Sequence, residues 1–153
     1  MFVRLTRLVF LATLLLAVGE ANAGPTIFGT YYDETVTSGS CGSNTCRLNF
    51  SQTPADKLVL VSKINCNLQT NLPPPAFFFQ IATTNGGNGL PRAIYLPFSP
   101  SILSGGIYYT TFREDTQFLV GQGRFPYVSM GFLSGVVGNM SCTLIGSLVS
   151  PSP

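Results

Sequence analysis

Two segments of the chain alternate between apolar and polar positions with the period of two that a β-strand requires. In residues 57–68 the even positions are mainly apolar and include Cys66, while the odd positions turn polar from Lys63 onward. In residues 140–149 an apolar phase containing Cys142 alternates with Ser and Thr. Each pattern predicts a strand with one face in the core and the other toward solvent.

Other short stretches rich in Val, Ile, Phe, Tyr and Thr lie between clusters of Gly, Pro, Asn and Ser, which indicate turns. These further predicted strands cover residues 26–37, 47–51, 76–83, 94–96, 106–113, 116–121 and 127–133. Residues 113–116 are predicted to form a polar hairpin turn, and residues 85–89 a flexible glycine-rich loop. The whole pattern predicts an all-β fold, an antiparallel β-sandwich or jelly-roll-like domain of about eight or nine strands, stabilised by disulfides.

The N-terminus has the three parts of a secretory signal peptide. Arg4 and Arg7 form a basic start, residues 8–18 are an apolar run, and Ala21 and Ala23 are the small residues that a signal peptidase reads. The run is shorter than the roughly 20 apolar residues that span a bilayer. The sequence therefore predicts export and cleavage.

This cleavage site divides the chain into three parts. Residues 1–23 are the signal peptide, residues 24–149 a single β-sandwich domain, and residues 150–153 a short Pro/Ser tail. We expect the mature protein to be secreted, into the periplasm or outside the cell, with no membrane span left after cleavage. The signal peptide is of a kind typical of bacteria.

The mature chain is nearly neutral. The full chain has eight basic and six acidic side chains, and removal of Arg4, Arg7 and Glu20 leaves six and five, a net charge of +1. This charge gives no electrostatic support for nucleic-acid binding, which needs several phosphate-neutralising residues. Charged residues make up 9% of the chain, so the surface polarity comes from hydroxyl and amide groups.

The four cysteines of an exported protein are expected to form disulfides. Cys66 and Cys142 lie on the apolar phases of their strands, so they are predicted to meet in the core as a bridge between packed strands that clamps the two sheets together. Cys41 and Cys46 are separated by four residues that turn easily, so they are predicted to close a local loop. With no histidine in the chain, imidazole-based zinc sites and Ser-His or Cys-His catalysis are excluded, and we expect no metal and no cofactor.

Five carboxylates remain after cleavage: Asp33, Glu34, Asp56, Glu114 and Asp115. A glycosidase needs two that face each other, whereas neighbours in a strand point to opposite faces. Two carboxylates from different strands, such as Glu34 and Glu114, could form such a pair. The minor alternative is therefore a carboxylate-based hydrolase. The leading expectation is a protein that is not an enzyme.

The tyrosine doublets are the best candidates for ligand contacts. Exposed tyrosines bind sugar faces or another protein at a low entropic cost. The doublets are Tyr31-Tyr32 and Tyr108-Tyr109, and one member of each should face outward. Tyr95 and Tyr127 are further candidates for outward-facing tyrosines. The leading hypothesis is an exported binding module for glycans or a cell-surface component. The alternative is a structural or assembly subunit of an envelope or extracellular complex, with homo-oligomerisation left open.

Overall fold

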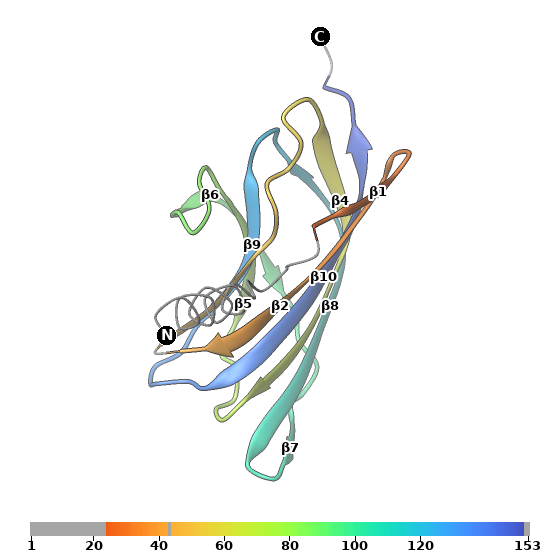
Figure 1. Ribbon diagram of the computed structural model, residues 1–153. Coiled ribbons are helices and arrows are strands. Elements are labelled where there is room, and N and C mark those ends of the chain that lie inside the picture. Colours follow the sequence, from red (N-terminus) through yellow and green to blue (C-terminus); the bar gives the residue numbers. More distant parts are fainter. Residues whose placement is uncertain (1–23, 43, 152–153) are drawn as a thin grey trace, which may run out of the picture.

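A computed structural model of the protein describes residues 24–42 and 44–151, and shows two antiparallel sheets. The signal peptide expected over residues 1–23 lies outside the described residues. The six-stranded sheet has the order β1 (Thr26–Phe28), β2 (Tyr31–Cys41), β10 (Gly138–Val149), β4 (Leu58–Thr70), β8 (Ile107–Val120) and β7 (Ile102–Ser104). The four-stranded sheet has the order β3 (Thr45–Asn49), β9 (Phe125–Gly131), β5 (Phe77–Ala82) and β6 (Gly89–Leu96). The predicted all-β, antiparallel class is confirmed (Figure 1).

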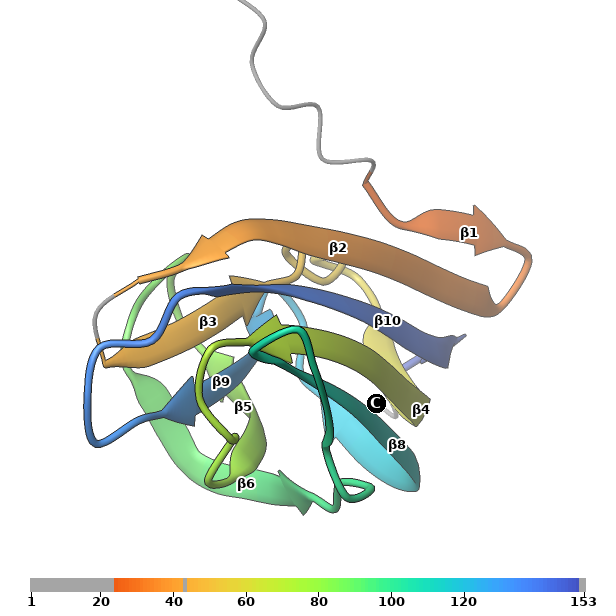
Figure 2. The same cartoon turned by 90° about the horizontal axis from the view of Figure 1, so that it is seen from below.

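The two sheets face each other as two layers and share one hydrophobic core (Figure 2). Phe77 and Phe79 of β5 point inward and are almost fully buried. The Phe77 ring contacts that of Phe112, and Phe79 meets Phe118 edge to face at a centroid distance of 5.3 Å. Since β5 and β8 belong to different sheets, these aromatic pairs hold the layers together.

Four antiparallel strand pairs are nested along the chain, so that the first strand of the series pairs with the last and the two middle strands pair with each other. β5 pairs with β6, β4 with β8, β3 with β9 and β2 with β10, all antiparallel. Successive pairs alternate between the two sheets. The central strands β10 and β4 of the larger sheet are therefore in direct contact although they are far apart in the chain.

Residues 26–37, predicted as one strand, form parts of two strands. Gly29 and Thr30 make a turn between β1 and β2, across which Phe28 pairs with Tyr31. Gly29 has a φ of 60°, which glycine adopts without strain. The prediction was wrong because Tyr, Phe and Ile on both sides of the turn read as one continuous β-forming stretch.

Residues 113–116, predicted as a hairpin turn, lie inside β8 instead. Asp115 pairs with Lys63 of β4 across the outer face of the six-stranded sheet, with a distance of 3.3 Å between Nζ and Oδ1. A polar run is compatible with a strand that has solvent on one side. The ladder between β4 and β8 shifts register between Val61 and Lys63, where β8 contains one residue more than β4. A local irregularity of the bulge type accommodates this extra residue.

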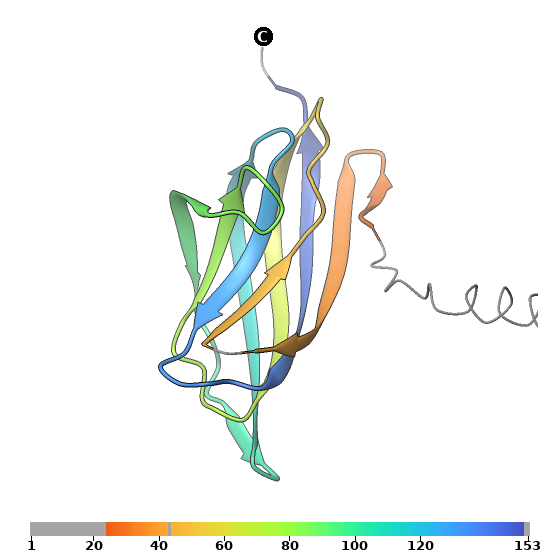
Figure 3. The ribbon, with the colours of Figure 1, turned by 60° about the vertical axis from the view of Figure 1, so that its left-hand side comes forward.

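The edges of the sheets also differ from the prediction, and residues 24–42 and 44–151 form ten strands. β7 was not predicted, and β6 begins at Gly89, within the predicted glycine-rich loop. Pro91 is tolerated inside β6 because β6 is an edge strand, where a missing N–H need not leave a neighbour unpaired. In Figure 3 the β7–β8 hairpin extends beyond the rest of the six-stranded sheet.

Both predicted disulfides are present, and Cys41–Cys46 closes a local loop of five positions as predicted, but Cys66–Cys142 does not have the expected role. Cys66 and Cys142 lie directly opposite each other on β4 and β10, with 4.1 Å between their Cα atoms. This bond faces the core, yet it joins neighbouring strands of one sheet and does not clamp the two sheets. The sequence shows which face each cysteine occupies but not that their strands are neighbours.

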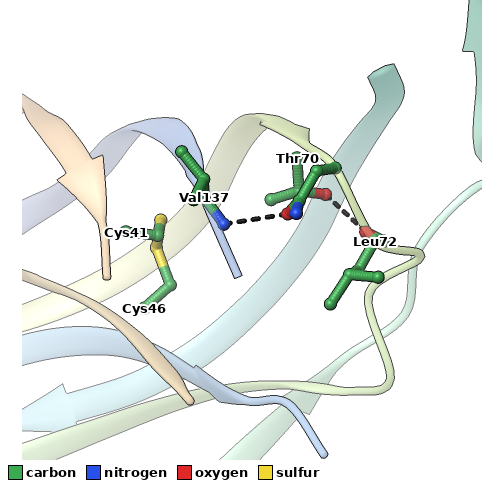
Figure 4. The surroundings of a disulfide bond; sticks show 6 residues. Cys41, Cys46, Thr70, Leu72 and Val137 are labelled. Atoms are coloured by element: carbon green, nitrogen blue, oxygen red, sulfur yellow. Dashed lines mark hydrogen bonds between the residues drawn. A yellow bond between two sulfur atoms is a disulfide. The ribbon is translucent and has the colours of Figure 1, made fainter. Parts of the chain in front are cut away.

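The local disulfide, Cys41–Cys46, is the one that connects the sheets. Cys41 ends β2 of the larger sheet and Cys46 lies in β3 of the smaller sheet. Figure 4 shows this bond near Val137, whose backbone N–H donates to Asn71 Oδ1 at 2.8 Å. The loops that precede β5 and β10 are thereby tied together beside the disulfide.

Candidate functional site

The tyrosine doublets do not form a common site. Tyr32 is fully buried, Tyr108 is half-buried, and Tyr31 and Tyr109 are 45% and 42% exposed. Tyr31 lies in the same cross-strand row as Leu119 of β8, because the residues between them, Ser147 and Leu60, pair in turn. Leu119 is ten positions from Tyr109 along β8. The two exposed rings are therefore about 30 Å apart along the strands, at opposite ends of the six-stranded sheet.

The buried Tyr32 has a structural contact. Its hydroxyl donates to Glu34 Oε2 at 2.9 Å, and the backbone N–H of Ser51 donates to Glu34 Oε1 at 2.8 Å. Both carboxylate oxygens of this buried side chain are thus hydrogen-bonded. Because Ser51 follows β3, the carboxylate links the two sheets.

Burial of the ring, together with the Glu34 carboxylate, raises the pKa of the Tyr32 hydroxyl above its ordinary value near 10. The unfolded chain therefore loses this proton at a lower pH than the folded chain. We expect the free energy of unfolding to fall by up to about 1.4 kcal/mol per pH unit from pH 10 upward. Urea denaturation at pH 8, 10 and 11 should show a shallower decline for Tyr32→Phe than for the unmodified chain. Equal slopes would contradict this assignment.

The carboxylate pair considered for hydrolysis is widely separated. Glu34 and Glu114 lie in one cross-strand row with Leu144 and Ile64 between them. Three strand spacings place their backbones about 14 Å apart. Glycosidases hold their two carboxyl groups about 5 to 9.5 Å apart, so this row does not provide such a pair.

A denser group of polar and aromatic side chains lies on the outer face of the four-stranded sheet, which is turned toward the viewer in Figure 3. Two cross-strand rows run from β3 through β9 and β5 to β6. We call these eight residues the outer face of the four-stranded sheet: Asn49, Tyr127, Gln80 and Ala93 in one row, and Arg47, Ser129, Phe78 and Tyr95 in the other.

Arg47 and Tyr127 form the centre of this face. The Arg47 guanidinium lies over the Tyr127 ring, with its Cζ 3.6 Å from the ring centroid. Arg47 Nε donates to Asn49 Oδ1 at 2.8 Å, and the Tyr127 hydroxyl donates to Gln80 Oε1 at 2.9 Å. Tyr127 is only 4% exposed although it points away from the core.

The loop between β5 and β6 covers this centre. Arg47 Nη1 donates to the Gly87 carbonyl at 2.8 Å and approaches the Gly86 carbonyl at 3.4 Å. In Figure 3 the loop passes in front of β9. A Cβ at Gly89, the first residue of β6 after the loop, would overlap the Tyr127 hydroxyl, so the close approach of the chain at this point favours glycine. The predicted glycine-rich loop thus serves as a cover for the sheet.

The other end of the Arg47 row is open and aromatic. Tyr95 is 71% exposed, and its ring meets that of Phe78 edge to face at a centroid distance of 4.7 Å. Rings held by such contacts are suited to stack on the apolar face of a sugar. Arg47 and Tyr95 stand three strand spacings apart, about 14 Å, with Ser129 and Phe78 between them.

Sequence reasoning identified Tyr95 and Tyr127 only as secondary candidates and missed Arg47, Asn49 and Gln80. The alternation of Arg47 and Asn49 with buried Cys46 and Leu48 does place both on the outer phase of β3. The pairing of β3 with β9 instead of its sequence neighbour β4 brings them to Tyr127, and the sequence carries no signal for that pairing.

No protein-family model matches this sequence, and neither a curated protein nor a solved structure matches it. Among residues 24–42 and 44–151 there is no cluster of three or more metal-ligating side chains. Within the same ranges, no helix is long and apolar enough to cross a membrane. Function is therefore inferred from the residues of the site itself.

Proposed function

We propose that this protein is an exported, non-catalytic binding module that recognises saccharides on the outer face of its four-stranded sheet. The row from Arg47 to Tyr95 is the observation that carries the proposal. It combines the exposed Tyr95 and the half-buried Phe78 with hydroxyl and guanidinium groups, and the neighbouring row adds the amides of Asn49 and Gln80. In ligand sites a few such polar groups orient a mainly apolar contact. The two disulfides support an oxidising, non-cytoplasmic location, in agreement with the N-terminal signal pattern.

We further propose that the domain is a β-sandwich of the jelly-roll type. With the edge strands β1 and β7 set aside, eight strands remain in chain order. Their pairing as first with eighth, second with seventh, third with sixth and fourth with fifth is that of a rolled ribbon divided between two sheets. Such a fold presents sheet faces as recognition surfaces, although the fold alone does not assign a ligand.

The test is a saccharide-binding measurement on matched tyrosine variants. We expect Tyr95→Ala to raise the Kd for a bound oligosaccharide about fivefold or more, because truncation of an exposed aromatic anchor removes more than about 1 kcal/mol of binding energy. Tyr109→Ala, which removes a 42% exposed ring from the other sheet, should leave the Kd unchanged. A glycan array followed by titration calorimetry measures both. Equal effects of the two variants would contradict the proposed surface.

The second candidate function is a structural or assembly subunit, and the exposed apolar residues favour it. Ile102 and Leu103 of β7 are 70% and 58% exposed, and Phe28 beside the β1–β2 turn is 84% exposed. These residues lie on edge strands, where another chain can add a strand or bury an apolar surface. A folded protein that binds no saccharide but forms oligomers in light scattering would favour this function over the first.

A further inference from the structure

The guanidinium of Arg47 has an incomplete set of partners. Its Nε and Nη1 donate to Asn49 and to the loop carbonyls, while the buried Nη2 has no hydrogen-bond partner among the described residues. The one ion pair among residues 24–42 and 44–151 is Lys63–Asp115, on the other sheet. The positive charge of Arg47 is thus partly buried, and no carboxylate of the described residues pairs with it. Such an arrangement is costly unless an anion completes it.

We infer that the ligand is an acidic saccharide whose carboxylate binds the Arg47 guanidinium through a bidentate pair of hydrogen bonds. This inference rests on the proposed saccharide function and specifies its substrate class. A guanidinium presents two parallel N–H groups that match the two oxygens of a carboxylate. Arg47 is the only charged side chain in the two rows of the outer face, so the site suits a single negative charge.

The loop carbonyls occupy part of the place that the carboxylate would take. Nη1 faces the carbonyls of Gly87 and Gly86, and the carboxylate pair would use Nη1 together with the unpartnered Nη2. Hydrogen bonds from a guanidinium to a carboxylate are stronger than those to a neutral carbonyl, so the ligand displaces the loop from Arg47. Binding should therefore release residues 85–88 and uncover Tyr127 and Gln80 beside the sugar.

Once the loop is displaced, the neighbouring residues extend the contact beyond the carboxylate. Asn49 and Gln80 offer amide groups for sugar hydroxyls, and Tyr95 offers its ring at the far end of the row. The face spans about 14 Å from Arg47 to Tyr95, so it is long enough for an oligosaccharide and not only a single ring. The acidic sugar occupies the Arg47 end.

The experiment compares charged and neutralised forms of the same sugars. Oligosaccharides of galacturonate, glucuronate and mannuronate, each with its methyl ester, are titrated against the mature protein in low salt. We expect at least one acid to bind tenfold or more tightly than its ester, and this preference to disappear in Arg47→Gln. Arg47→Lys keeps the positive charge but lacks the two parallel N–H groups of a guanidinium, so its preference for the acid over the ester should be several-fold smaller than that of the unmodified protein. Arg113→Gln, an exposed site on the other sheet, is the control and should change nothing.

Hydrogen exchange supplies a second readout that does not depend on any variant. Backbone amides of residues 85–88 should exchange faster in the complex than in the free protein, because the Arg47 contacts are lost. Slower exchange of these amides would overturn the displacement of the loop.

The outcomes separate this inference from the function on which it rests. If neutral saccharides bind as tightly as acidic ones, and Tyr95→Ala weakens their binding, the inference of an acidic ligand is wrong and the proposed binding function remains. Tighter binding of sulfated oligosaccharides than of any uronate would overturn the carboxylate. If no saccharide binds the folded protein, the proposed function fails together with the inference.

Discussion

Replacing both Cys66 and Cys142 with alanine is expected to lower the free energy of unfolding by about 4.5 kcal/mol. The disulfide closes a loop of 76 positions, so its loss restores a large conformational entropy to the unfolded chain. Both residues are also 1% exposed in the core, where lost sulfur contacts are not replaced by water. Urea denaturation of the double variant against the unmodified protein, both without reductant, measures the difference.

The matched control is the double replacement of Cys41 and Cys46. This disulfide spans only five positions, for which the same loop-entropy relation gives about 2 kcal/mol. We therefore expect removal of Cys41–Cys46, which links the two sheets, to lower the free energy of unfolding less than removal of Cys66–Cys142, which lies within one sheet. The reverse order would show that the connection between the sheets matters more than the entropy of the unfolded loop.

The cysteines illustrate how far the sequence can predict this fold. The alternation in residues 57–68 and 140–149 places Cys66 and Cys142 on inward phases, and from these phases the correct pairing follows. Alternation reports the face of a residue but not the neighbour of its strand. Whether the bond would join two sheets or two adjacent strands therefore depended on the pairing of β4 with β10, a contact between distant segments.

The errors in the strand boundaries have a similar origin. A polar segment such as residues 113–116 resembles a turn when it is considered alone, because Glu and Asp are uncommon in strands. In the folded protein its neighbour β4 supplies Lys63 opposite Asp115, and the ladder continues through it. Local propensity was overridden by a partner that the local sequence does not contain.

The candidate site was less predictable than the fold. Exposed tyrosines were recognised by type, but Tyr31 and Tyr109 were separated by the register of the six-stranded sheet. Arg47, in contrast, was not a candidate because a single arginine in an edge strand usually lies in solvent. It enters the proposed site because its guanidinium stacks on Tyr127 and because the loop between β5 and β6 contacts it.

The three consecutive phenylalanines of β5 divide core and site between them. Phe77 and Phe79 face the core, whereas Phe78 lies between them on the outer face and contacts Tyr95. Neighbouring residues of one strand thus serve stability and the proposed binding separately. This division allows fold and ligand surface to be tested with substitutions of identical chemistry.

Phe79→Ala is expected to lower the free energy of unfolding by about 3–5 kcal/mol, because it removes a fully buried ring that packs edge to face on Phe118 of the opposite sheet. Phe78→Ala removes the same ring from a half-buried outer position, so its cost should be about 1 kcal/mol or less.

Saccharide binding should respond in the opposite way. Phe78→Ala removes the ring that orients Tyr95 and should weaken binding several-fold, while folded Phe79→Ala should bind as the unmodified protein does. Denaturant unfolding and titration calorimetry on both variants provide the comparison. If Phe78→Ala destabilised the protein as much as Phe79→Ala and left binding intact, the outer face of the four-stranded sheet would be structural, and the ligand surface would have to lie elsewhere.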